Sequence, residues 1–147
     1  MYPRFGLTLM VTHACNLRCD YCYTGRKFDR SMPEAVAQRC VDRGLASLAP
    51  GGTLELGFFG GEPLLKADLI ARTIDYAAER AAAAGAGLSL GLTTNGTITT
   101  REAWVIMTRP DLELAVSHDG LPPAHDRHRR FAFGAGTLEG LDVLAVG

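Results

Sequence analysis

The sequence has few cysteines, almost no net charge and no long apolar run. Only four of its 147 residues are cysteines, and 15 Lys and Arg against 16 Asp and Glu give a formal net charge of −1. This charge gives no electrostatic reason to expect a nucleic-acid partner or an anionic membrane surface. No apolar run approaches the roughly 18 to 20 residues that a membrane-spanning helix needs. We therefore expect neither nucleic acid nor a membrane as a partner.

The N-terminus also lacks a targeting signal. Its first residues, Met1-Tyr2-Pro3-Arg4, contain neither the n-region nor the apolar h-region of a secretory signal peptide. This absence favours the cytoplasm, where thiols stay reduced and neighbouring cysteines more often bind metals than form disulfides. The length predicts a single domain, and the hydrophobic content of 47% is ordinary for a globular protein.

Strand-like and helix-like runs alternate along the chain. The predicted strands are Gly6–Val11, Thr53–Phe59, Leu88–Thr93 and Leu112–Val116. These runs are apolar on both faces or nearly so, which is typical of strands buried in a parallel sheet. The alternation predicts an α/β fold, and right-handed crossovers would bring the loops after the strands to one rim of the sheet.

Helix start and stop signals lie between these strands. Residues 31–34 (Ser-Met-Pro-Glu) and 99–102 (Thr-Thr-Arg-Glu) both match a capping box, which predicts a helix beginning at each. Leu65–Ala84 carries apolar residues at helical spacing, and Gly85 can end that helix. Gly136–Val146 is a candidate for a fourth helix.

Each predicted strand is followed by residues that suit a binding site. The segments are the cysteine-rich run His13–Cys22, Gly60–Pro63, Thr94–Gly96 and Ser117–Gly120. Taken singly, Asn-Gly and Asp-Gly are ordinary turn dipeptides and a Gly-Gly pair is more often a turn than a binding loop. Four such loops on one rim of a parallel sheet, however, form the layout of an active site.

The cysteine spacing favours an iron–sulfur cluster. Cys15, Cys19 and Cys22 follow the pattern C-x3-C-x2-C, and three thiolates from one loop can bind three corners of a cubane and leave the fourth iron open. The rival interpretation is a zinc site that adds His13, although a histidine two residues before Cys15 wraps poorly around a tetrahedral ion. Cys40 lies within a helical pattern and is predicted to be a buried core thiol.

Together these motifs resemble the radical S-adenosylmethionine (radical SAM) superfamily. The resemblance includes the cysteine spacing with an aromatic residue, Tyr21, just before the third cysteine, and the Gly-Gly-Glu motif after the second strand. It extends to Thr94–Thr97 and Ser117–Gly120, and the run from His125 to Arg129 is similar to the peptide and protein maturases of this superfamily. That subgroup includes anaerobic sulfatase-maturating enzymes and relatives with a SPASM or twitch extension.

The resemblance implies two cofactors. A 4Fe–4S cluster would be held by Cys15, Cys19 and Cys22, and its open iron would take the amino and carboxylate groups of S-adenosylmethionine. Reductive cleavage would then release a 5′-deoxyadenosyl radical that abstracts a substrate hydrogen. The residues implied in S-adenosylmethionine binding are Tyr21, Gly60, Gly61, Glu62, Asn95, Ser117 and Asp119. Among these, Glu62 would accept hydrogen bonds from the methionine amino group, and the two glycines would let the backbone approach the cofactor.

The family core usually has six strand–helix units, and this chain has room for about four. We therefore expect a partial (β/α) barrel of the radical SAM type that is truncated, with residues 1–147 forming the N-terminal part of the core domain. One hypothesis is the first half of a maturase that acts on a peptide or protein and takes electrons from a flavodoxin- or ferredoxin-type donor. The alternative is a non-catalytic or partner-dependent iron–sulfur-binding module.

Overall fold

A four-stranded parallel sheet organises the molecule. The computed structural model describes residues 1–132, and the strand order is β1-β2-β3-β4. The strands are β1 (Tyr2–Thr12), β2 (Leu48–Gly60), β3 (Gly87–Thr94) and β4 (Leu112–Val116). All three neighbouring pairs are parallel, so the predicted α/β class and all four predicted strands are confirmed. The first two strands begin earlier than predicted because Tyr2 pairs with Leu48, across a register shift before Arg4.

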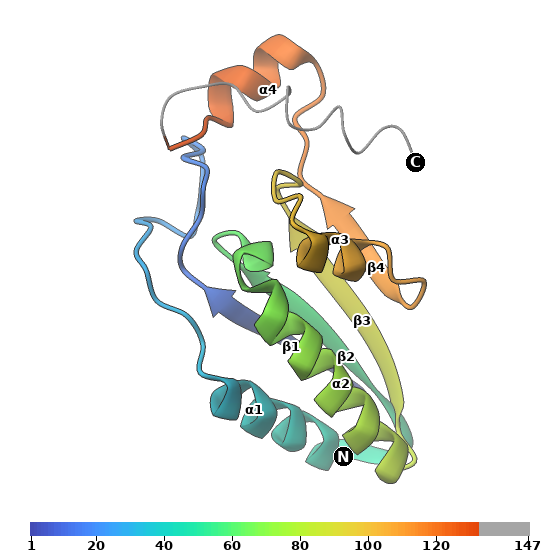
Figure 1. Cartoon of the computed structure of the whole chain (residues 1–147). Helices are drawn as coiled ribbons and strands as arrows, with labels where there is room; N and C mark the ends of the chain where they lie inside the picture. The colour runs from blue at the N-terminus through green and yellow to red at the C-terminus, as the bar shows by residue number, and fades with distance from the viewer. Residues whose placement is uncertain (133–147) are drawn as a thin grey trace.

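Five helical segments connect and flank the strands. They are α1 (Glu34–Ala46), the 3-10 turn η1 (Pro63–Lys66), α2 (Ala67–Ala83), α3 (Arg101–Met107) and α4 (Pro122–His128). Helices α1, α2 and α3 lie on the same face of the sheet, and α4 lies beyond the ends of the strands (Figure 1). None of the helices in residues 1–132 is long and apolar enough to cross a membrane.

The helix starts differ in detail from the sequence predictions. The first capping box is wrong: α1 begins after Pro33 with no side-chain cap, and Ser31 instead forms a bridge with Thr12. For α3 the cap is Thr100, whose hydroxyl accepts a hydrogen bond from Ala103 N at 3.2 Å, one residue later than predicted. The predicted stop at Gly85 is confirmed by its φ of +62°, and Gly136–Val146 lies outside the described residues.

The hydrophobic core lies between the sheet and the helices on its covered face. Leu54, Leu56 and Phe58 of β2 are at most 1% exposed and pack with Ile70 and Ile74 of α2 in one apolar cluster. The residues that alternate with them along the strands belong to the opposite face of the sheet. Burying the covered face fixes the strand register, because a slip of one residue would turn the apolar side chains outward.

The opposite face of the sheet carries small and polar residues. One row across the four strands is Thr8, Gly57, Gly91 and Glu113 in register, and these residues are partly or fully exposed. Two shallow depressions run along this face. The sequence prediction that the strands are apolar and buried on both faces is therefore wrong for this face in the described residues. Glycines and hydroxyl side chains bury little apolar surface, so exposing this row costs little hydrophobic free energy.

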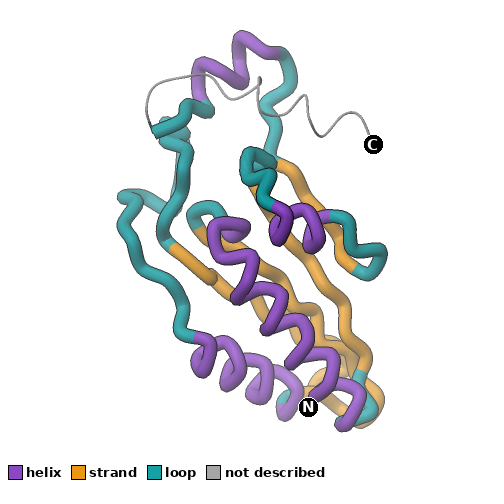
Figure 2. The backbone as a smooth tube through the Cα atoms, viewed as in Figure 1, coloured by secondary structure: helices purple, strands orange, loops and turns teal. Residues whose placement is uncertain are grey.

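Parallel pairing brings the carboxyl ends of all four strands to one rim. The loops that follow β1, β2 and β3, together with the segment from β4 to α4, gather at this end of the sheet (Figure 2). These are the loops that contain the motifs singled out in the sequence. The fold therefore collects the four sequence motifs in one place, as the crossover rule predicts.

Candidate functional site

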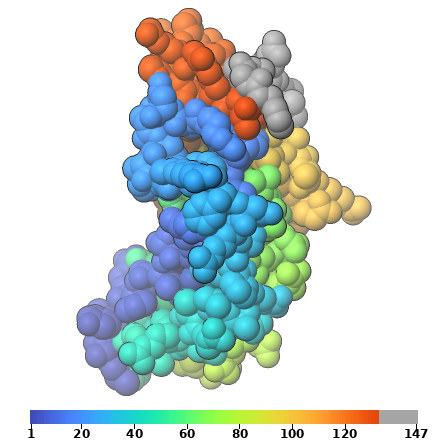
Figure 3. Space-filling view, turned by 90° about the vertical axis from the view of Figure 1, so that its left-hand side faces the viewer, coloured from blue at the N-terminus to red at the C-terminus, as the bar shows by residue number. Residues whose placement is uncertain are grey.

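The cysteine loop after β1 pairs with residues 130–132, which follow α4. Leu17, which is 1% exposed, forms an antiparallel bridge with Phe131. Backbone hydrogen bonds on either side extend this contact, from Arg18 N to Arg130 O at 2.7 Å and from Ala132 N to Asn16 O at 2.9 Å. Figure 3 shows the loop (blue) along one side of the molecule, below α4 (orange). This pairing holds the cysteine loop against the rim.

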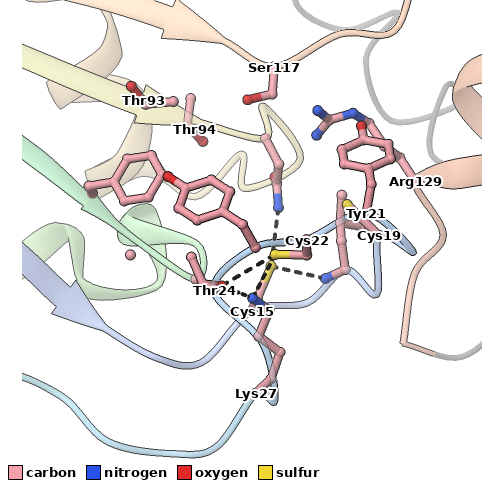
Figure 4. Close-up of a pocket in the computed structure, with 16 residues that line it drawn as sticks. Cys15, Cys19, Tyr21, Cys22, Thr24, Lys27, Thr93, Thr94, Ser117 and Arg129 are labelled. Atoms are coloured by element: carbon pink, nitrogen blue, oxygen red, sulfur yellow. Dashed lines mark hydrogen bonds between the residues drawn. The ribbon is translucent and has the colours of Figure 1, made fainter.

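The three predicted ligand cysteines line one pocket at the rim. Cys15, Cys19 and Cys22 are free thiols, and the pocket has an empty volume of about 630 Å³ including its open mouth. The other lining residues come from the same loop, from the ends of β2, β3 and β4, and from the end of α4: Leu17, Tyr21, Tyr23, Thr24, Lys27, Phe59, Gly60, Gly61, Thr93, Thr94, Asn95, Ser117 and Arg129. Figure 4 shows their side chains around the sulfur atoms.

The sulfur atoms of Cys15 and Cys22 have different surroundings. Burial raises the pKa of Cys15, although its Sγ accepts hydrogen bonds from Leu17 N at 3.3 Å and Asn95 Nδ2 at 3.8 Å. Burial also acts to raise the pKa of Cys22. There, however, the hydrogen bond from Lys27 Nζ at 2.9 Å and the contact with Thr24 at 3.3 Å outweigh it, and the pKa lies below its usual value.

Cys19 is the ligand cysteine that faces the guanidinium of Arg129, at the α4 side of the pocket. Burial raises the pKa of Cys19, and the guanidinium of Arg129 acts against this increase. Cys40, by contrast, is partly buried and packs against the hydrophobic core through α1, away from the pocket. Cys40 was predicted to be a buried core thiol within a helix; it lies in α1 and packs against the core, but it is only partly buried.

The three thiols are not grouped as the ligands of a single metal ion. No three His, Cys, Asp or Glu side chains in residues 1–132 lie close enough together to hold one ion. A zinc site requires closely grouped ligands: two sulfurs on one zinc ion would be at most about 4.6 Å apart, since each Zn–S bond is ~2.3 Å. His13, the fourth ligand of the zinc hypothesis, stacks on Phe28 with ring centroids 4.4 Å apart and lies outside the pocket. Three thiols that each bind a different iron of a cluster need not converge on one point.

The Gly60-Gly61 pair lets two loops approach each other closely. Gly61 N donates to Thr12 O and Glu62 N donates to Ala14 O, both at 2.8 Å. A Cβ on Gly61 would lie 2.1 Å from Ala14 O, and one on Gly60 would lie 2.4 Å from Thr12 O. The sequence prediction assigned these glycines to cofactor approach. In the structure a side chain there would already collide with the chain's own backbone, next to Cys15.

A Gly61→Ala substitution should therefore disturb the cysteine loop. Because the clash is with a backbone oxygen, we expect the free energy of unfolding to fall by about 1–3 kcal/mol, as for an overpacked core. Urea unfolding of the metal-free chain would measure this effect. Gly57→Ala is the matched control on β2, the strand that Gly61 follows, since its Cβ would meet no atom closer than 3.5 Å. Equal stability of the two variants would contradict the steric explanation.

Glu62 lies behind the pocket wall and ties two loops together. Its side chain is 1% exposed. Oε1 accepts hydrogen bonds from Leu64 N at 3.0 Å and Thr94 Oγ1 at 2.7 Å, and Oε2 accepts one from Asn95 N at 2.7 Å. Burial raises the pKa of Glu62, and these hydrogen bonds act against that increase. Within the described part of the chain no cationic side chain forms an ion pair with this carboxylate.

Asp119 connects Tyr21 and Arg129 at the mouth of the pocket. The hydroxyl of Tyr21 donates to Asp119 Oδ2 at 2.6 Å, and Arg129 Nε donates to Asp119 Oδ1 at 2.8 Å. The Arg129 guanidinium also lies 5.4 Å from the centre of the Tyr21 ring. Burial acts to raise the pKa of Asp119, but its hydrogen bonds from Tyr21 and Arg129 lower it overall. Burial and the Asp119 carboxylate raise the pKa of Tyr21.

The structure brings most of the predicted residues to one place. Tyr21, Gly60, Gly61, Asn95 and Ser117 line the pocket with the three cysteines. The other two do not line it: Glu62 lies behind the pocket wall, and Asp119 holds Tyr21 and Arg129 at its mouth. Sequence reasoning missed the polar contacts made by Thr24 and Lys27, for which the only sequence signal was closeness to Cys22.

Comparison with known proteins decides the family. Residues 9–144 match the Radical SAM superfamily. The chain belongs to that superfamily. Among curated relatives, this radical SAM chain is 31% identical to the GTP 3',8-cyclase of Xanthomonas campestris pv. campestris over 99% of its length and 43% of the relative's. It is 34% identical to the PqqA peptide cyclase of Bradyrhizobium diazoefficiens over 67% of its length and 25% of the relative's.

Solved structures share the fold of this radical SAM chain. The anaerobic sulfatase-maturating enzyme anSMEcpe with bound AdoMet superposes with a TM-score of 0.83 at 22% identity, covering 97% of this chain and 40% of that one. The same protein with bound AdoMet and the Cp18Cys peptide gives a TM-score of 0.81. The partial radical SAM fold is thereby confirmed. The chain spans less than half the length of these relatives and structures.

Proposed function

We propose that residues 1–147 are the N-terminal part of a radical SAM core domain that binds a 4Fe–4S cluster and S-adenosylmethionine in the pocket at the rim. The observation that carries this proposal is that three free thiols from one loop line a pocket together with the ends of β2, β3 and β4. Family membership supports the same two cofactors. A cytoplasmic location is part of the proposal because cluster thiolates need a reducing compartment.

The residues of the pocket suit these two cofactors. When bound, the cluster would supply one electron to split S-adenosylmethionine into methionine and a 5′-deoxyadenosyl radical. Cys15, Cys19 and Cys22 would hold three irons. Glu62 is a buried carboxylate with one acceptor position left on Oε2, which supports a role in binding the methionine ammonium group. A positive ligand group would compensate the buried negative charge.

Other pocket residues would position the rest of S-adenosylmethionine. Asn95 and Ser117 provide polar groups at the ends of β3 and β4, suited to ribose or methionine contacts. Tyr21 offers an aromatic face whose hydroxyl is held by Asp119, suited to a place beside the adenine. In this assignment Asp119 orients Tyr21 and Arg129 rather than touching the cofactor itself.

We further propose a peptide or protein substrate and an external flavodoxin- or ferredoxin-type electron donor. Support for the substrate class comes from the PqqA peptide cyclase relative and from the anSMEcpe structure with a bound peptide. The face of the sheet with the Thr8–Gly57–Gly91–Glu113 row is open, and its two glycines leave room above the strands. A substrate lying there would be next to the rim pocket, because Phe59 and Thr93 line both the rim pocket and one of the two depressions on this face.

A specific observation favours a second candidate, a partner-dependent cluster-binding module. Within the described residues, β4 pairs only with β3 and leaves Leu114 and Val116 exposed. An unpaired strand edge of this kind invites pairing with another segment or chain.

Anaerobic reconstitution of the chain distinguishes the two candidates. With iron, sulfide, dithionite and S-adenosylmethionine, we expect a bound cluster and measurable 5′-deoxyadenosine by chromatography. The rate of 5′-deoxyadenosine formation should be low, because a partial barrel holds the reacting groups less firmly and small misplacements are costly in rate. The Cys15→Ala variant is the control for non-enzymatic cleavage. A bound cluster with no 5′-deoxyadenosine above this control would favour the module, and a chain that binds only zinc would contradict both candidates.

A further inference from the structure

Lys27 reaches into the pocket and contacts one of the three ligand cysteines. Its Nζ lies 2.9 Å from Cys22 Sγ and also donates to the hydroxyl of Thr24. That hydroxyl is itself 3.3 Å from the same sulfur. Lys27 is partly buried and lines the pocket, whereas its neighbour Arg26 is exposed and does not. Figure 4 shows Lys27 and Thr24 joined to Cys22 by dashed lines.

The hydrogen bonds to the sulfur atoms are unequal. Cys15 Sγ accepts from a backbone amide and from the neutral side chain of Asn95, whereas Cys22 Sγ accepts from an ammonium group. Hydrogen bonds that involve a charged group are shorter and roughly twice as strong as neutral ones. The pocket therefore concentrates its strongest donor on a single ligand sulfur.

We propose that Lys27 tunes the reduction potential of the cluster, raising it through its hydrogen bond to the Cys22 sulfur. The proposal rests on the proposed function, because it requires a cluster on these cysteines. One electron added by an external reductant increases the negative charge on the cluster and its sulfur ligands. A fixed positive charge beside one sulfur stabilises the reduced state more than the oxidised state. Hydrogen bonds to sulfur and local net charge are among the factors that set such potentials.

The position of Lys27 makes this effect larger than that of a surface charge. Charges in contact inside a partly buried pocket interact several-fold more strongly than the same charges in bulk water. Exposed charges are screened by salt. Arg26 has the same charge one residue away, but its side chain is exposed and lies outside the pocket. Lys27 is thus a positioning residue that acts through Cys22, and Arg26 provides a matched control for loss of one positive charge.

The test is a potentiometric titration of the reconstituted full chain without S-adenosylmethionine, followed by electron paramagnetic resonance. In Lys27→Gln we expect the equilibrium constant for one-electron reduction to fall about tenfold, which equals a potential ~59 mV more negative. Lys27→Arg, which keeps the charge and donors, should recover most of this loss. Arg26→Gln should resemble the wild type. Lys27→Met provides a second neutral side chain if the glutamine variant fails to fold.

Several outcomes would overturn the proposal. Equal potentials in the wild type and both neutral Lys27 variants would show that the hydrogen bond does not affect the cluster. An equal shift in Arg26→Gln would show a general charge effect instead. Weaker S-adenosylmethionine binding with an unchanged potential would assign Lys27 to the cofactor's carboxylate. In each of these cases the cluster is present, so the proposed function survives; a wild type without a cluster would overturn both.

Discussion

Replacing Cys15, Cys19 or Cys22 singly by alanine should abolish stable cluster formation, whereas Cys40→Ala should retain it. Each of the three thiols lines the rim pocket, and Cys40 packs against the core through α1. With only three protein ligands to begin with, a cubane that loses one retains two and is no longer held firmly. We expect about four irons per chain in the wild type and in Cys40→Ala, and close to none in the other variants.

Iron and sulfide analysis after anaerobic reconstitution would measure this difference, with electron paramagnetic resonance of the reduced samples to identify the cluster type. Far-ultraviolet circular dichroism is the control for folding, since the cysteine loop lies outside the helices and strands. Cluster loss in Cys40→Ala would contradict the assignment. Zinc in place of iron in the wild type would revive the single-ion interpretation that includes His13.

The sequence was sufficient to predict the sheet and the place of the site. Strand and helix periodicities alternate clearly, and parallel pairing leaves one rim for the loops that follow the strands. The cysteine spacing, the Gly60-Gly61 pair and Asn95 could be recognised because each belongs to a short local motif. The structure places all of them around one pocket.

Helix α4 and the contacts between distant segments could not be predicted from the sequence. Helix α4 was missed because its residues, Pro-Pro-Ala-His-Asp-Arg-His, lack an apolar stripe, although prolines in the first turn are a helix-start signal. The pairing of Leu17 with Phe131 has no local pattern at all. Glu62 was predicted to touch a cofactor, and only the structure shows that three groups of the chain already hydrogen bond to its carboxylate.

That internal bonding makes Glu62→Gln a sharper test of cofactor binding than Glu62→Ala. Glutamine keeps the shape of the side chain and an oxygen for Leu64 N and Thr94, but it removes the charge that would attract an ammonium group and replaces the acceptor of Asn95 N by an NH2 donor. Loss of one charge-assisted hydrogen bond corresponds to about 1.5–3 kcal/mol, or roughly ten- to hundredfold in S-adenosylmethionine affinity. Calorimetry on the reconstituted chain would measure it, and iron content should be unchanged.

Glu55→Gln is the matched control for this substitution. Glu55 lies on β2, the strand that leads to Glu62, where it forms an ion pair with Arg4, and it does not line the rim pocket. Its replacement removes the same charge from the chain, so we expect S-adenosylmethionine affinity to stay at the wild-type level. Equal affinity in all three proteins would show that Glu62 serves only to hold the loops together.

The raised pKa of Glu62 adds a pH dependence with opposite signs for folding and for binding. Burial lifts the pKa of Glu62 above its ordinary value of 4.5, so between that value and the folded-state pKa the folded chain binds more protons than the unfolded chain. Its contribution to stability is complete below pH 4.5 and is lost as the pH rises through the folded pKa. An ammonium ligand prefers the ionised carboxylate, so S-adenosylmethionine affinity should increase over the same interval. Urea unfolding and calorimetry would show both trends as a difference between the wild type and Glu62→Gln, because an amide does not titrate there and other shifted carboxylates, such as Asp119, are common to both proteins.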